Sequence, residues 1–206
     1  MLPKVLEKED AKIVIENKDG KQCPYFFADT PLARRLSGLT QIMHDLGHAK
    51  ELMSLADTVD DSNLAYSLWM SAVVTYGKCF ASAEGRKIKL ELEHVTRFNP
   101  EAIDYHNALL DQRNTYFAHA GQNEYEQANV GVILAPEDEE RKVLWVNHLM
   151  VKKSGISSDE IKMFNALCEG LYDIVEKIVE PVHERVLQEY RAMNIDDLYK
   201  KAHEKT

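Results

Sequence analysis

The chain has 206 residues, of which 45% are hydrophobic and 29% charged, and its formal net charge is −9 at pH 7. This length suits one large domain that buries a sizeable core without a disulfide or metal staple. The excess of negative charge argues against broad, non-specific affinity for phosphate backbones, so any nucleic-acid site must gather its cations in one place.

The cysteines and the apolar patterning favour a cytoplasmic protein. Cys23, Cys79 and Cys168 lie far apart and form no CxxC pair, which is typical of free thiols in a reducing compartment. The N-terminus lacks the basic start and apolar core of a secretory signal. No apolar run is long enough to span a bilayer, and we expect no interaction with a membrane.

Residues 1–29 are predicted to form an extended arm or a short hairpin. The β-branched residues 12–16 precede a turn sequence at residues 18–20, and a second apolar patch follows at residues 25–27.

Two long helices are predicted next. Thr30 can cap the first helix and Pro31 can begin it. Its apolar stripe has spacings of three and four residues and consists of Leu32, Leu36, Leu39, Met43, Leu46 and Met53. Residues 60–62 break the pattern and can cap the second helix, whose stripe consists of Leu64, Leu68, Trp69, Ala72, Val73, Tyr76 and Phe80.

A third helix and a β-hairpin follow. Asn99 supplies a cap, Pro100 a first-position proline and Glu101 a first-turn acid, and we expect this helix to end near Gly121. Two β-like runs joined by a polar turn then predict a β-hairpin insertion at residues 128–150.

The last long helix is predicted to begin near Ser158, with Pro181 kinking or restarting it. Its stripe consists of Ile161, Phe164, Cys168, Leu171, Val175, Ile178 and Val182. Residues 192–206 are expected to form a mobile or loosely docked tail. The sequence therefore predicts a mainly α fold in residues 1–206: a single domain with an antiparallel bundle of four to five helices, a small β-hairpin insertion and a short N-terminal extended segment.

Familiar catalytic motifs are absent from the sequence: GxGxxG, GxxxxGK[ST], GxSxG and HExxH do not occur. His44 and His48 would lie on one helical face and could share a zinc ion. With Asp45 they are similar to the HDxG core of the HD phosphohydrolase family, so a metal-dependent hydrolase is one hypothesis. That family needs an upstream metal-binding histidine, and His44 is the first histidine of the chain. We therefore predict neither a metal nor a cofactor.

The most informative stretch is DQRNTYFAHAG, at residues 111–121. Arg113 is followed directly by the polar Asn114 and, six residues on, by His119. This pattern resembles the signature of the HEPN superfamily, an arginine followed after four to six residues by a histidine, with a polar residue favoured directly after the arginine. The AHAG ending and the run WMSAVVTYGKCF at residues 69–80 are also similar to a small bacterial branch of that superfamily. The resemblance covers the middle third to half of the chain.

The resemblance implies a helical bundle that forms a homodimer through the helix bearing the motif, with two motifs facing each other across a two-fold axis. Active members of the superfamily are metal-independent endoribonucleases. The resemblance therefore implies an enzyme of the toxin or defence type, with RNA or a nucleotide and an antitoxin protein as partners.

The residue types of the motif suit RNA cleavage. His119 could move a proton from the ribose 2′-hydroxyl, or to the leaving oxygen, near neutral pH. Arg113 could clamp the phosphate with two hydrogen bonds and stabilise the charge of the phosphorane, and Asn114 could orient either residue. These three residues are the candidate catalytic residues.

Tyr76, His106 and Tyr116 are the candidate substrate-binding residues. His106 lies two helical turns before Arg113 on the same face, and the hydroxyl of Tyr76 could reach a cleft near the third helix. Both positions are more typical of buried or half-buried core residues than of ligand-binding residues.

The spacing of the motif leaves alternatives open. Six residues at about 100° each place Arg113 and His119 roughly 120° apart on an ideal helix. They converge only if the last turn unwinds, or if each chain of a dimer supplies one of them. The alternative function is a non-catalytic module that binds a nucleotide, RNA or a protein in the same groove. In the purely structural interpretation, Arg113 pairs with Asp111 or a core acid, and His119 caps the helix.

Overall fold

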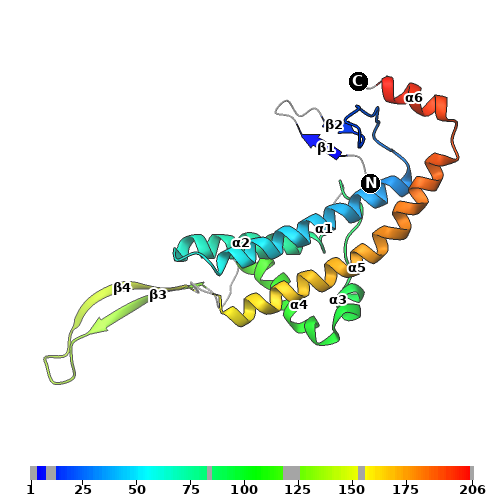
Figure 1. The fold of residues 1–206 in the computed structure, drawn as a ribbon. Coiled ribbons are helices and arrows are strands. Elements are labelled where there is room, and N and C mark those ends of the chain that lie inside the picture. The colour runs from blue at the N-terminus through cyan, green and yellow to red at the C-terminus, as the bar shows by residue number, and fades with distance from the viewer. Residues whose placement is uncertain (1–3, 8–12, 83–84, 118–125, 153–155, 205–206) are drawn as a thin grey trace. The chain divides into compact units, whose positions relative to one another are not determined.

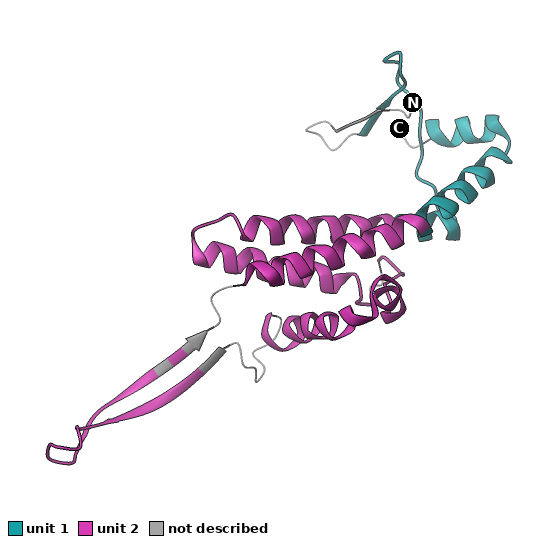
Figure 2. Ribbon diagram, turned by 60° about the horizontal axis from the view of Figure 1, so that its bottom comes forward, with its two compact units in different colours: residues 1–37, 178–206 teal, residues 38–177 magenta. Residues whose placement is uncertain are grey.

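The computed structural model describes residues 4–7, 13–82, 85–117, 126–152 and 156–204 (Figure 1). It is mainly helical, with a two-stranded antiparallel hairpin inserted between helices, as the sequence predicted. The chain divides into two compact units, residues 38–177 and residues 1–37 with 178–206 (Figure 2).

Four helices supply most of the core of the unit at residues 38–177. They are α1 (Pro31–Ala56), α2 (Ser62–Lys78), α4 (Ile103–Asp111) and α5 (Ser158–Arg191), of which α1 and α5 continue into the other unit. Asp61 caps α2 by accepting hydrogen bonds from the backbone of residues 63 and 64, as its position in the sequence predicted.

Side-chain contacts show how these helices are arranged. Lys50 of α1 pairs with Glu169 of α5, and Ser54 bonds to Asn165, so α1 and α5 run antiparallel. The buried side chains from the four helices include Leu39, Ile42, Leu46, Ala49, Met53, Trp69, Val73, Tyr76, Leu109, Phe164, Leu167, Leu171 and Val175.

The predicted stripes are largely confirmed. Leu36 and Leu68 are half-buried, and the core face of α1 is shifted so that Ile42 is buried where Met43 was expected. The prediction for Leu64 is wrong. That residue is 49% exposed because it lies in the first turn of α2, before the part that other helices cover.

A short helix that the sequence did not reveal, α3 (Leu92–Phe98), precedes the predicted third helix. The Glu91 backbone amide donates to His94 Nδ1 at 3.0 Å, which caps this helix. The turn η1 (Pro100–Ala102) follows, with the Asn99 side chain accepting from the Glu101 amide at 3.0 Å. The predicted cap at Asn99 is therefore confirmed.

The inserted hairpin consists of β3 (Glu126–Leu134) and β4 (Val143–Lys152), antiparallel, with a register shift at Ile133 and Leu134. It is slightly longer than predicted. After it, α5 runs from Ser158 through Pro181 without restarting.

The second unit contains β1 (Lys4–Glu7), β2 (Ile13–Glu16) and α6 (Ile195–His203). β2 pairs with β1, which precedes it, and not with the apolar patch at residues 25–27. The turn after β2 does form, because the Asn17 side chain accepts two backbone hydrogen bonds and Gly20 takes a φ of +73°. Pro24, which follows this turn, has no N–H to donate to β2 and so cannot extend a strand paired with it. The tail forms α6, whose Lys201 lies over the ring of Phe26.

Among the described residues, no helix combines the length and the apolar character needed to cross a bilayer. Cys23, Cys79 and Cys168 are all free thiols. Burial raises the pKa of the Cys79 thiol to about 12, so this buried thiol is unreactive near neutral pH.

Candidate functional site

The motif helix changes its geometry at the predicted site. α4 ends at Asp111 and continues directly as a π-helical segment, η2 (Gln112–Phe117), which contains Arg113 and Asn114. A π-helical turn is wider than an α turn and is frequent at functional sites. The last turn of the helix therefore departs from ideal geometry, as convergence of Arg113 with a residue beyond it would require. His119 lies outside the described residues.

Arg113 is half-buried, and the aliphatic part of its side chain packs against a neighbouring helix. Its Cγ, Cδ and Nε atoms lie directly against Gly77 of α2, where a Cβ atom would overlap them. Its Nη1 donates a hydrogen bond of 2.9 Å to Oδ1 of Asn114, an exposed residue. Gly77 thus provides a seat for the apolar stem, while the charged fork lies beside a surface amide.

The structural interpretation of Arg113 finds no support in the described part of the chain. Arg113 forms no ion pair there, and Asp111 is exposed, with its backbone carbonyl accepting from Thr115. Among the described residues, the guanidinium uses one of its five N–H donors, on Asn114. It therefore keeps the capacity for two-pronged binding of a phosphate.

Two of the predicted substrate-binding residues contact each other in the core. Oη of Tyr76 lies 2.6 Å from Nδ1 of His106, and the side chains are 0% and 3% exposed. The His106 ring also packs on Phe80, with ring centroids 4.4 Å apart. The pair joins α2 to α4 one residue from Gly77. Contact of either residue with a substrate stays a prediction, and in this structure they position the helix that carries Arg113.

Burial affects the ionisation of this pair. Desolvation lowers the pKa of His106 and raises the pKa of Tyr76. Both groups are therefore neutral near pH 7 and share one hydrogen bond, whose direction follows the imidazole tautomer.

We expect the lowered pKa of His106 to make folding stability depend on pH. Because its pKa is lower in the folded than in the unfolded chain, the unfolded chain binds the extra proton below about pH 6.5. The contribution of His106 is thus complete above that pH and is lost as the pH falls. Urea unfolding from about pH 7.5 to about pH 5.5 should show falling stability. His106→Gln should flatten this dependence, whereas His48→Gln, at an exposed position, should not.

Tyr116 belongs to an aromatic cluster that fixes the π-helical segment against α2. It is 8% exposed and packs on Phe117, with ring centroids 4.9 Å apart. Phe117 in turn meets Trp69 edge to face at 4.9 Å, and Tyr66 contacts both η2 rings. The cluster stabilises the segment by aromatic packing, and a substrate contact of Tyr116 stays a prediction.

The residues of the metal-hydrolase hypothesis are not gathered into a metal site. His44 and His48 stack loosely, with ring centroids 6.3 Å apart, and both are exposed. The Asp45 carboxylate forms ion pairs with two basic side chains, Lys78 at 3.0 Å and Arg86 at 3.2 Å. Within the part of the chain that the structure describes, no group of three or more metal-binding side chains comes together.

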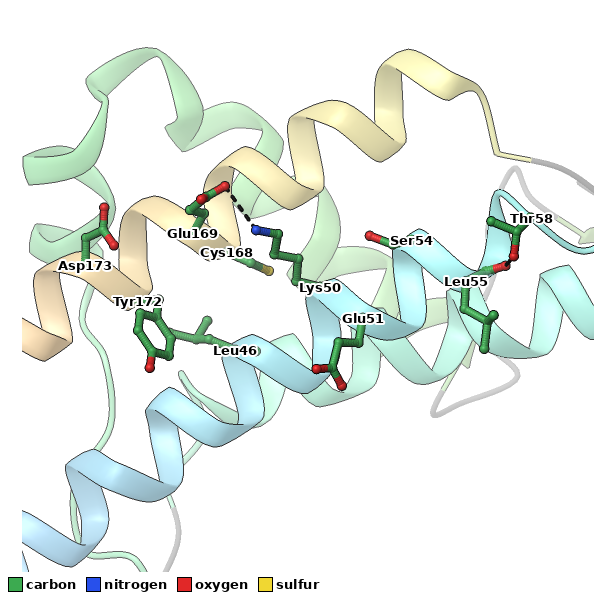
Figure 3. A pocket seen from close by; sticks show the side chains of 11 residues that line it. Leu46, Lys50, Glu51, Ser54, Leu55, Thr58, Cys168, Glu169, Tyr172 and Asp173 are labelled. Atoms are coloured by element: carbon green, nitrogen blue, oxygen red, sulfur yellow. Dashed lines mark hydrogen bonds and ion pairs between the residues drawn. The ribbon is translucent and has the colours of Figure 1, made fainter. Parts of the chain in front are cut away.

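A groove of about 700 Å³ lies between α1 and α5 (Figure 3). Its walls are joined by the ion pair of Lys50 and Glu169, 3.1 Å apart. Glu51 and Asp173 add two more carboxylates, so acids outnumber the lysine. The size suits a small molecule, but the charge disfavours a phosphate. Sequence reasoning missed this groove, because its walls lie more than a hundred residues apart and form no local motif.

The seat of Arg113 was also missed. Gly77 belongs to the run at residues 69–80 that is part of the family resemblance. No sequence spacing, however, indicates that Gly77 contacts Arg113. No family model, curated protein or solved structure matches the chain. The functional interpretation therefore depends on the motif and on the geometry around it.

Proposed function

We propose that the chain is a HEPN-like, metal-independent endoribonuclease of the toxin or defence type, acting as a homodimer, in which Arg113 and His119 carry the chemistry. The observation that supports this proposal most directly is the placement of Arg113. Its stem is seated against Gly77, on a π-helical turn, and its guanidinium lies beside the exposed amide of Asn114. A structural arginine would instead be expected to pair with an acid.

The proposed reaction is an intramolecular transesterification at an RNA phosphodiester. His119 removes the proton of a ribose 2′-hydroxyl, and the resulting oxygen attacks the adjacent phosphorus. The bond to the 5′-oxygen breaks, and the His119 imidazolium returns its proton to that oxygen, leaving a 2′,3′-cyclic phosphate and a 5′-hydroxyl. Arg113 donates hydrogen bonds to the phosphorane oxygens as their charge develops, and Asn114 holds the guanidinium in position.

Cleavage of a mixed RNA pool in the presence of EDTA tests this proposal. We expect the wild-type protein to cleave RNA with the chelator present, because the mechanism needs no metal. It should leave 2′-deoxy substrates intact, because these lack the attacking hydroxyl. His119→Ala should abolish cleavage, whereas His48→Ala, at an exposed histidine of α1, should have no effect.

The second candidate function is a non-catalytic module that binds RNA, a nucleotide or a protein through the same residues. The net charge of −9 favours it, since an acidic surface repels the phosphate backbone of an RNA substrate. A wild-type protein that binds RNA in an Arg113-dependent way without cleaving it would establish this function and reject the catalytic one.

A further inference from the structure

The hairpin of β3 and β4 has one markedly apolar face. Directly paired residues of antiparallel strands lie on the same side of the sheet, and the sides alternate along each strand. The register pairs Val132 with Val146, Val130 with His148 and Ala128 with Met150. The large apolar residues on this side, which we call the valine face, are Val130, Val132, Leu134, Val143, Val146 and Met150.

The valine face is exposed to solvent. Its six large side chains are 55–73% exposed, so none of the described chain covers them. The other side of the hairpin is mixed: Asn129 and the pair of Gly131 with Asn147 form its polar middle, and the exposed pair of Ile133 with Trp145 lies nearer the turn. The valine face is therefore the more continuous apolar surface of the hairpin, because polar residues interrupt the other side.

A two-stranded hairpin is marginally stable in water at best without a covered apolar face. Exposed strands are usually protected from pairing by charges or proline, but residues 127–134 and 143–151 contain no Lys, Arg, Asp, Glu or Pro. The turn that joins them contains the four consecutive acids at residues 137–140. This acidic turn disfavours nucleic acid and an anionic membrane as the binding partner of the hairpin.

We propose that the valine face packs against the valine face of a second copy of the chain. Six side chains of this size and exposure present on the order of 600 Å², and two such faces would bury about 1,200 Å² in total, within the range of specific interfaces. Two identical faces related by a two-fold axis complement each other by symmetry. The uncharged strands bring no like charges together when they meet.

This proposal does not depend on RNA cleavage. The dimer implied by the HEPN resemblance uses the motif helix, whereas this interface uses the hairpin that follows the motif. Variants that alter only one side of the hairpin distinguish these two interfaces experimentally.

The test is the molar mass of the full chain by light scattering during size-exclusion chromatography, at several micromolar concentrations. We expect the wild-type protein to have twice the molar mass of a variant whose valine face is disrupted: a dimer against a monomer, or a tetramer against a dimer where the motif helices also pair. Val132→Lys places a charge in the middle of the valine face and should weaken the dimer about ten-fold or more. Asn147→Lys introduces the same charge one register position away, on the opposite side, and should leave the dimer intact. Val132→Thr retains the shape and the strand propensity, and should weaken the dimer by a smaller factor.

Helical circular dichroism should be the same for all four proteins, because the hairpin lies outside the helical core. A monomeric wild-type mass at every concentration would overturn the proposal, and sedimentation with lipid vesicles would then identify a membrane as the partner. A molar mass that Val132→Lys leaves as high as that of the wild type and of Asn147→Lys would assign the interface to another surface and would also overturn the proposal.

Discussion

Arg113→Ala is expected to reduce RNA cleavage about a hundred-fold or more, because one charge-stabilising donor at the developing phosphorane is lost. The same change should cost about 1 kcal/mol of folding stability or less. The guanidinium bonds to an exposed amide, and the lost contact is the packing of its stem on Gly77. Single-turnover cleavage of RNA and urea unfolding measure the two quantities separately.

Matched variants make this result specific. Arg97→Ala removes an exposed arginine from the neighbouring α3 and should change neither quantity. Arg113→Lys retains the charge but loses the planar fork, so it should restore cleavage only in part. If Arg113→Ala instead destabilises the protein by about 3–5 kcal/mol, as loss of a buried charge partner does, and the wild type cleaves no RNA, Arg113 is a structural residue.

Gly77→Ala tests the same site without altering a charged residue. A Cβ at this position overlaps the Arg113 stem, so the guanidinium must move and cleavage should fall. Gly47→Ala is the control, since its Cβ would meet nothing within 4 Å. It should raise stability by up to about 1 kcal/mol through helix propensity and leave cleavage unchanged. Because Gly47 lines the groove between α1 and α5, loss of activity in Gly47→Ala would move the functional site to that groove.

The sequence predicted the parts of the fold that depend on local chemistry. Thr30, Asp61 and Asn99 each form the expected cap through a hydrogen bond to a backbone amide no more than three residues away. The hairpin was predicted because alternating apolar residues flank a polar turn, and only its ends were placed short of the observed ones. These features require no knowledge of distant residues.

Features that depend on distant residues or on subtle backbone geometry could not be predicted. The pairing of β2 with β1 follows from where the chain turns back, and the apolar patch at residues 25–27 was an equally apolar candidate. The π-helical segment carrying Arg113 has no sequence signature in its six residues. Its widened turn is fixed by packing on α2, which a single segment does not encode.

The sequence predicted one pair of the candidate site residues better than the other. The resemblance identified Arg113 and Asn114, and the structure joins them by a hydrogen bond. Their positions on the predicted helices suggested Tyr76 and His106 as substrate-binding residues, and the structure joins these two as well, but in the core. A tyrosine and a histidine at such positions are more typical of a core, but they also suit a cleft. Only the packing of Phe80 and Phe164 around them distinguishes the two.

Phe164→Ala is expected to lower the free energy of unfolding by about 3–5 kcal/mol, because a fully buried ring is lost and the cavity relaxes only partly. Phe164 is 0% exposed and its ring centroid lies 5.6 Å from that of Tyr76. The melting temperature should fall on the order of 10 °C, measured by helical circular dichroism, with the urea midpoint shifted in parallel.

The residue that precedes Phe164 on α5 supplies the control for this change. Met163 is 50% exposed, so Met163→Ala should change stability by about 0.5 kcal/mol or less. Because Phe164 supports Tyr76, and Tyr76 bonds to His106 on the helix that leads to Arg113, the folded Phe164→Ala protein should still bind RNA at low temperature but lose that binding at a lower temperature than the wild type. Equal destabilisation by the two variants would mean that α5 buries a different face, and the link from the core to Arg113 would then be wrong.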